Sequence, residues 1–239
     1  MKNVQKLGGF AALYLAVAYA IGIALFLVVL DYPHIVEPTQ KVALLVDKSM
    51  VIYLTNLILY VLFGVVLVVL ALALYERLQS AASAIIRMAT AIGLIWAGML
   101  IASGMVANAG IAPVVALAGK DPAQAALAWL AIESVANGLS SANGEILGGI
   151  WTLLVTWAAW QAKDLPKGLN YLGLVVGVVG LISAIPGLND LTGLFGISQM
   201  LWFIWLGIVL LRSKPSAAAE ADVGRQDDAR RAAWTPKTP

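Results

Sequence analysis

Cysteine is absent from the 239 residues of this chain, and histidine occurs once, as His34 in the first predicted external loop. The absence of cysteine excludes disulfides, thiolate metal sites, iron–sulfur clusters and cysteine nucleophiles. A lone, solvated histidine cannot form a multi-histidine site, and no HExxH zinc motif, Walker loop or haem ligand pair can be assembled. We therefore expect no metal site and no cofactor.

Charged residues are also scarce. They make up 12% of the chain, against roughly 25% in soluble domains, whereas hydrophobic residues make up 61% and the mean hydropathy is +0.89. A soluble fold could not bury so much apolar surface. The net charge of +2 is small and scattered, so the clustered basic face of nucleic-acid-binding proteins is excluded. The composition indicates an integral membrane protein whose main partner is the lipid bilayer.

Six apolar runs can cross a bilayer when modest tilt is allowed, since about 20 apolar residues span the hydrocarbon core. Proline and glycine lie where these helices are expected to end, at Pro33, Pro113, Pro166 and Pro186-Gly187. The runs cover residues 7–30, 50–75, 85–108, 145–160, 169–185 and 194–211. The prediction is an all-α, polytopic membrane bundle with about six transmembrane helices.

The basic residues give this bundle an orientation. With six crossings and a cytoplasmic N-terminus, twelve Lys and Arg residues fall inside and only Lys41, Lys48 and Lys120 outside, as the excess of positive charge in cytoplasmic loops requires. A seventh crossing over 123–137 would move Lys163, Lys167 and the basic tail outside. We therefore predict a bacterial inner (plasma) membrane protein with cytoplasmic termini, a transmembrane domain over 1–212 and a flexible cytoplasmic tail over 213–239.

The stretch 122–163 is too long for one crossing. A single helix would rise about 60 Å, twice the hydrocarbon thickness of about 30 Å. Residues 138–144, Gly-Leu-Ser-Ser-Ala-Asn-Gly, supply turn and capping residues. The chain is therefore expected to break there, which leaves an external or re-entrant helix over 123–137 before the fourth span.

Small-residue spacing predicts close helix packing. Gly144-x-x-x-Gly148 and Gly173-x-x-x-Gly177 mark faces where two backbones can approach. The contact can lie within the bundle or between chains. A homo-oligomer or another membrane-protein partner therefore stays open.

Several short motifs resemble a bacterial family of multi-pass membrane proteins known only as a domain of unknown function, the DUF-4386-like group. They are Gly-Gly-Phe-Ala-Ala-Leu-Tyr at 8–14, Leu-Ala-Leu-Tyr at 72–75, Gly-Ile-Trp at 149–151 and Leu-Pro-Lys-Gly-Leu at 165–169. The resemblance covers about residues 6–212. It implies a membrane bundle and carries no activity or catalytic residue to this chain.

Polar residues bordering the spans are the candidates for a site. A charge at the bilayer centre costs at least about 2.5–3.5 kcal/mol, so polar residues within or beside a span are by default candidates for a function. In the predicted orientation they gather in the external third and can converge on an outward-facing pocket. The candidate ligand-binding residues are Asn56, Asn108, Glu133, Asn137, Glu145 and Asp190.

Five of the six candidates also have a structural interpretation. Asn56 and Asn108 can join helices by hydrogen bonds, and Asp190 can stabilise a turn. Glu145 can lie in the first turn of a helix, where the dipole favours a carboxylate. Glu133 is either functional or an interfacial carboxylate satisfied by its neighbours.

The leading hypothesis is a non-enzymatic protein that binds or passes a small polar or lipidic ligand through this pocket. The broken helix supports it, since interrupted helices expose backbone groups to ligands. One alternative is a structural or accessory subunit of a membrane complex. Another is a lipid-modifying enzyme with Glu133 or Glu145 as base, which needs two carboxylates near one site.

Overall fold

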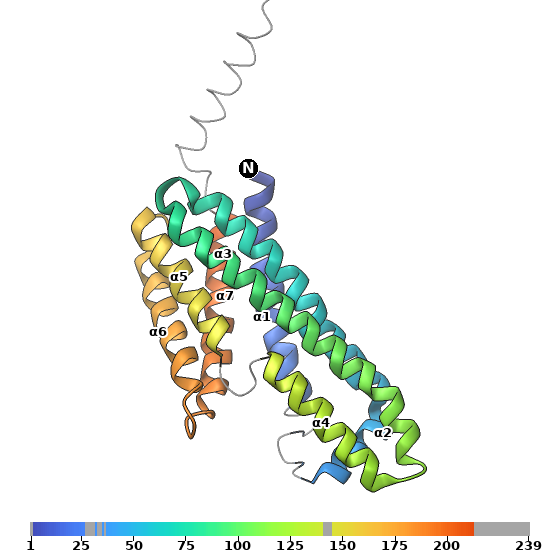
Figure 1. Ribbon diagram of the computed structural model, residues 1–239. Helices are drawn as coiled ribbons and strands as arrows, with labels where there is room; N and C mark the ends of the chain where they lie inside the picture. The colour runs from blue at the N-terminus through green and yellow to red at the C-terminus, as the bar shows by residue number, and fades with distance from the viewer. Residues whose placement is uncertain (1, 27–31, 33–34, 36, 141–144, 213–239) are drawn as a thin grey trace, which may run out of the picture.

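The structure, a computed structural model, describes residues 2–26, 32, 35, 37–140 and 145–212. The elements are α1 (Lys2–Ala24), α2 (Pro38–Asn56), the π-helical η3 (Leu57–Leu62), α3 (Phe63–Ala118), α4 (Pro122–Ser140), α5 (Ile146–Ala162), α6 (Lys167–Ser183) and α7 (Leu191–Arg212) (Figure 1). Within those ranges there is no strand, and the predicted all-α bundle is confirmed. His34 and the predicted tail 213–239 lie outside the described residues.

The segment from α2 to the end of α3 forms two long antiparallel arms. Its helix is kinked at Lys48, whose φ of −120° and ψ of 29° are not helical. It then continues to Ala82, whose φ of −139° and ψ of 44° are also not helical, and there the chain reverses (Figure 1). At 1.5 Å per residue, the first arm (38–81) is about 66 Å long and the second (83–118) about 54 Å. Both exceed the hydrocarbon thickness of about 30 Å.

The two arms extend further than the apolar runs indicated. The prediction that Pro113 marks a helix end is wrong, because Pro113 lies inside α3. Ile111 and Val114 beside it are buried against α4, and this packing favours continuing the helix past the proline. Pro38, in contrast, occupies the first turn of α2, where its missing N–H costs nothing.

Length and composition mark three helical segments of the described chain as able to cross a membrane: Asn3–Ala24, Pro38–Ala118 and Leu191–Arg212. Two shorter helices, Ile146–Ala162 and Lys167–Ser183, are also apolar. Because Pro38–Ala118 folds back at Ala82, the bundle consists of six apolar arms, which are α1, the two long arms, α5, α6 and α7.

The bundle has a core rich in tryptophan. Trp96 of the second long arm packs against Trp151 of α5 with ring centroids 5.7 Å apart, and Trp151 meets Trp202 of α7 edge to face at 5.8 Å. All three side chains are fully buried. The second long arm, α5 and α7 therefore meet at one aromatic centre.

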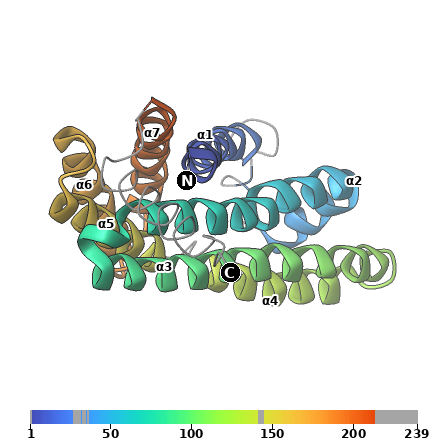
Figure 2. The ribbon, with the colours of Figure 1, turned by 90° about the horizontal axis from the view of Figure 1, so that it is seen from above.

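A second, smaller core lies to one side of the bundle. There α2, the C-terminal part of α3 and α4 form what we call the extension (Figures 1 and 2). Its buried apolar residues are Val42, Leu45, Ile52, Ile111, Val114, Ala125, Ala126 and Trp129. Helix α4 contains the helix predicted over 123–137 and continues to Ser140, so the prediction that the chain breaks already at 138–140 is wrong. The rest of the predicted break, 141–144, lies outside the described residues, and α5 begins at Ile146.

The glycine faces serve packing inside the bundle. A Cβ added to Gly149 of α5 would lie 2.9 Å from the carbonyl oxygen of Gly177 in α6, and one added to Gly180 would lie 3.0 Å from the Cα of Gly149. Where α1 crosses α7, a Cβ on Gly207 would lie 3.0 Å from the carbonyl oxygen of Gly9. At these positions the glycine faces are therefore occupied by helices of the same chain, whereas Gly144 of the predicted Gly144-x-x-x-Gly148 face lies outside the described residues.

The two ends of the bundle differ in their content of basic residues. The start of α1, the reversal at Ala82, the α5–α6 connection and the end of α7 lie at the same end of the bundle (Figure 1). An ion pair between Arg77 and Asp164 joins two of these segments. The basic residues of these segments include Lys6, Arg77, Arg87, Lys163, Lys167 and Arg212. The charge division found in the sequence is thus a division between two ends of the molecule.

Candidate functional site

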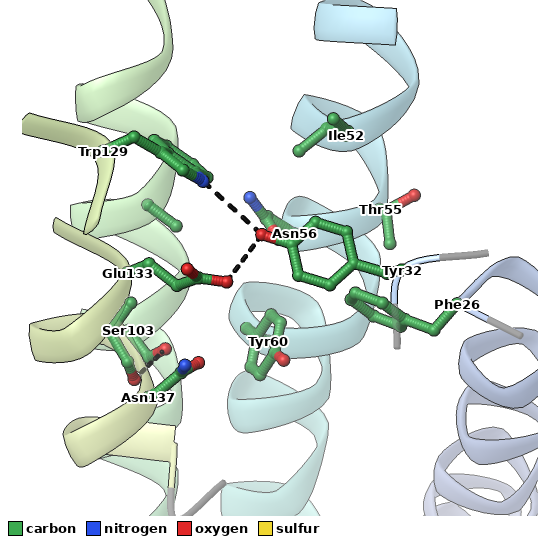
Figure 3. A pocket seen from close by; sticks show the side chains of 12 residues that line it. Phe26, Tyr32, Ile52, Thr55, Asn56, Tyr60, Ser103, Trp129, Glu133 and Asn137 are labelled. Atoms are coloured by element: carbon green, nitrogen blue, oxygen red, sulfur yellow. Dashed lines mark hydrogen bonds between the residues drawn. The ribbon is translucent and has the colours of Figure 1, made fainter. Parts of the chain in front are cut away.

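Three of the six candidate residues line one cavity at the junction of the bundle and the extension. We call it the polar cavity; its volume is about 70 Å³. Glu133 and Asn137 reach it from α4, and Asn56 from the opposite wall at the end of α2 (Figure 3). Tyr32, which precedes α2, lies between these walls (Figure 3).

Glu133 is held by three neighbours. The Tyr32 hydroxyl donates a hydrogen bond of 2.6 Å to Oε1, and the Lys41 ammonium group lies 2.8 Å from both carboxylate oxygens. Lys41 also lies 5.0 Å from the centre of the Tyr32 ring, and the Trp129 indole donates to the Tyr32 hydroxyl at 3.4 Å. Glu133 therefore has the satisfied environment that was one of its two sequence interpretations.

The pKa of the Tyr32 hydroxyl is raised well above its ordinary value. Burial is the main cause, and the hydrogen bond to Glu133 adds to it, because both disfavour the phenolate. Tyr32 therefore remains a hydrogen-bond donor to the carboxylate throughout the physiological pH range.

Asn56 and Asn108 join helices. The Asn56 side-chain amide donates to Oδ1 of Asn108 at 3.0 Å, and the Asn108 amide donates to the carbonyl oxygen of Tyr53 at 3.2 Å. Ser103 donates to the carbonyl oxygen of Ala136 at 2.8 Å, which ties α3 to α4. Asn56 also lines the polar cavity. Asn108 does not line it and is connected to it through the hydrogen bond with Asn56.

Glu145 borders a second and larger cavity of about 220 Å³, which we call the aromatic cavity. Its walls include Tyr19 of α1, Tyr60 of η3, and Phe63 and Trp96 of α3. Phe26 and Tyr60 also line the polar cavity, so the two cavities are neighbours. The aromatic cavity therefore lies deeper in the bundle, next to its tryptophan core.

The position of Glu145 is fixed by its backbone. Its N–H donates to the Ser183 hydroxyl at 3.1 Å, and its carbonyl oxygen accepts the Gly149 N–H at 2.9 Å. A Cβ added to Gly148 would lie 3.0 Å from Oε2 of Glu145 and 2.9 Å from the Trp96 ring. The carboxyl group therefore lies over the first turn of α5, in the space left by a glycine.

One oxygen of this carboxyl group, Oε2, is buried and has no hydrogen-bond partner among the described residues. Glu145 occupies the N-cap position of α5 but makes no side-chain cap hydrogen bond. The helix dipole stabilises a carboxylate there by about 0.3–2 kcal/mol, whereas removing an ion from water costs several kcal/mol. The dipole interpretation is therefore insufficient, and the carboxyl group needs a proton or a cation.

Asp190 does not join the other candidates. It is exposed in the turn between α6 and α7, where its carbonyl oxygen accepts the Gly193 N–H at 3.2 Å, and it lines neither cavity. The enzyme hypothesis needs two carboxylates at one site. Glu133 is paired with Lys41, Glu145 borders a different cavity and Asp190 lines neither, so the described residues place no two carboxylates in one cavity.

Sequence reasoning missed several of the residues around the two cavities. Tyr32 and Lys41 were assigned to an external loop, and Tyr19 and Tyr60 were counted only as apolar span residues. Within the described parts of the chain no three His, Asp or Glu side chains gather as a metal site.

Comparison with known proteins gives a family. No curated protein and no solved structure matches the chain. The family described as a domain of unknown function (DUF4386) matches residues 10–213, which include α1 from Phe10 onward, the other five arms of the bundle and the extension. This chain is therefore a member of the DUF4386 family.

Proposed function

We propose that this chain is a multi-pass membrane protein that binds a small polar or lipidic ligand in the aromatic cavity, between α1, η3 and α3. Six apolar arms cross the bilayer, with both termini in the cytoplasm. The extension and the cavities then lie toward the opposite, external side. The basic residues gathered at the other end of the bundle support this orientation.

A single observation carries the proposal: a cavity of about 220 Å³ is bordered by a buried carboxylate oxygen that has no hydrogen-bond partner in the part of the chain that the structure describes. Buried polar groups in native proteins are almost always hydrogen-bonded, and exceptions mark binding or catalytic groups. An intramembrane carboxylate is also costly to maintain. A ligand that contacts Glu145 removes both costs.

The neighbouring polar cavity supports binding rather than chemistry. Its carboxylate is neutralised within the protein by Lys41, so it can shape an entrance without reacting. With a volume of about 70 Å³ it is small. We assign the ligand to the aromatic cavity and a supporting role to the polar one.

The test is ligand retention after a cavity-filling substitution. Ala18 is buried in the cavity wall, so Ala18→Leu adds three carbons to the space that a ligand would use. Ala20→Leu is the matched control, because Ala20 lies on the same helix with its side chain exposed. Native mass spectrometry of protein extracted in mild detergent should detect a bound small molecule in the wild type and in Ala20→Leu. The molecule should be lost in Ala18→Leu. Equal occupancy in all three proteins, or none in any, contradicts the proposal.

A further inference from the structure

We propose that the ligand of the aromatic cavity is a monovalent organic cation, an amine or quaternary ammonium group with a small substituent, and that Glu145 is its counter-ion. This inference rests on the proposed function and adds the charge and chemical class of the ligand.

The first argument is a comparison of two carboxylates in neighbouring cavities. Glu133 has a cation of the protein beside it, since Lys41 Nζ lies 2.8 Å from its carboxylate oxygens. Glu145 has none: the described residues that line its cavity include no lysine, arginine or histidine. Its Oε2 is buried, and none of the described residues hydrogen-bonds to it. A bound cation would supply to Glu145 what Lys41 supplies to Glu133.

The second argument is the aromatic lining. The rings of Tyr19 and Phe63 meet edge to face with centroids 5.5 Å apart, and Phe63 meets Trp96 edge to face at 6.4 Å. Perpendicular rings present faces in different directions, as in the aromatic cages that bind quaternary ammonium groups. A cation within about 6 Å of such a face is attracted by the ring quadrupole.

The third argument concerns the volume of the cavity and the number of oxygen ligands that a metal ion requires. A volume of about 220 Å³ exceeds the roughly 150 Å³ of a cavity that takes up benzene, so a small organic cation fits. A calcium ion prefers about six to eight oxygen ligands. The described lining supplies only one carboxylate and the hydroxyls of Tyr19, Tyr60 and Ser140. The chemistry therefore favours an organic cation over a metal ion.

The experiment compares choline with 3,3-dimethyl-1-butanol, its uncharged carbon isostere, by isothermal titration calorimetry on the full chain in maltoside detergent. We expect choline to bind the wild type at least tenfold more tightly than the neutral isostere. Glu145→Gln should abolish this preference. Glu37→Gln, the same change at an exposed glutamate, should keep it.

Equal binding of choline and its isostere to the wild type, or no binding of choline, overturns the inference. So does a preference that persists in Glu145→Gln. If Glu145→Gln does not fold, the comparison of the two probes on the wild type decides alone. A neutral molecule retained by the wild type and lost in Ala18→Leu would keep the proposed function and overturn only the cationic ligand.

Two further titrations distinguish the source of the cation. The wild type is placed in nanodiscs of dioleoylphosphatidylcholine and in nanodiscs of dioleoylphosphatidylglycerol. Weaker choline binding in the phosphatidylcholine discs indicates that a lipid headgroup occupies the site. Equal affinity in both indicates a free cation. Loss of choline binding in both contradicts the proposal.

Discussion

The ammonium group of Lys41 lies 2.8 Å from both carboxylate oxygens of Glu133 and so connects α2 to α4 across the extension. The side chains are 19% and 11% exposed, respectively, so the pair is mostly shielded from solvent. Of the two residues, Glu133 lines the polar cavity. In contrast, Glu145 in the neighbouring cavity has no such partner.

Breaking this pair should loosen the extension. Lys41→Met leaves Glu133 with only the Tyr32 hydroxyl as a partner. We expect the free energy of unfolding to fall by about 1–3 kcal/mol, which is less than for a fully buried pair because both groups retain some solvent contact. Hydrogen exchange of residues 122–140 should rise with it. Lys120→Met, at an exposed position in the α3–α4 turn, is the control and should change neither quantity.

A double-mutant cycle separates this pair from general packing effects. If Lys41 and Glu133 interact, the double variant Lys41→Met/Glu133→Gln should be more stable than the sum of the single losses indicates. Strict additivity would show that the two side chains do not stabilise each other.

The Tyr32 hydroxyl gives the extension a pH dependence on the alkaline side. Its folded pKa is raised by burial and by Glu133, so its contribution to stability is complete below the unfolded value of about 10. The contribution is lost as the pH rises through the folded pKa. Thermal unfolding in detergent should show the wild type losing stability above about pH 10 more steeply than Tyr32→Phe. Tyr53→Phe, at an exposed tyrosine, should follow the wild type, and parallel curves for Tyr32→Phe and the wild type would refute the assignment.

Much of the fold could be predicted because membrane spans leave strong local signals. Apolar runs predicted the six arms, and the turn residues at 138–144 predicted that α4 and α5 are separate helices, although α4 continues to Ser140. The extension was harder to predict, because residues 38–49 mix Lys41, Asp47 and Lys48 with apolar side chains. That segment is helical where α3 and α4 cover its apolar face, and this cover is a property of the tertiary structure.

The candidate site was predictable only in part. Glu133 and Glu145 were found because carboxylates are rare in an apolar chain. Their partners were not, since Lys41 is 92 positions from Glu133 and no local rule connects them. The aromatic cavity needs Tyr19 from α1 and Tyr60 from η3 beside α5, and only the packing of the arms brings these elements together.

The α5–α6 contact should be intolerant of side chains at Gly149. An added Cβ would lie 2.9 Å from one backbone atom of α6 and 3.1 Å from another, so the helices must separate. Gly149→Ala should lower the free energy of unfolding by about 1–3 kcal/mol, as is typical when a side chain overpacks a tight contact. Gly98→Ala, where a Cβ meets nothing within 4 Å, should be neutral or stabilising. Equal thermal stability of the two variants would contradict the tight contact.

Orientation in the membrane can be tested directly because the chain has no native cysteine. We expect Ser80→Cys, next to the reversal at Ala82, to be protected from a membrane-impermeant maleimide in intact cells and labelled after permeabilisation. Gly119→Cys, in the α3–α4 turn, should be labelled in intact cells. Both positions are exposed, so the reverse pattern would invert the proposed topology.

The most direct test of ligand binding at Glu145 is an experimental structure of the wild type in lipid nanodiscs, at a resolution that resolves side chains and bound molecules. We predict non-protein density between Tyr19, Tyr60 and Glu145, with an atom within hydrogen-bonding or ion-pairing distance of the Glu145 carboxyl group. A collapsed or empty aromatic cavity, with both Glu145 oxygens bonded to protein groups, would contradict ligand binding at this site.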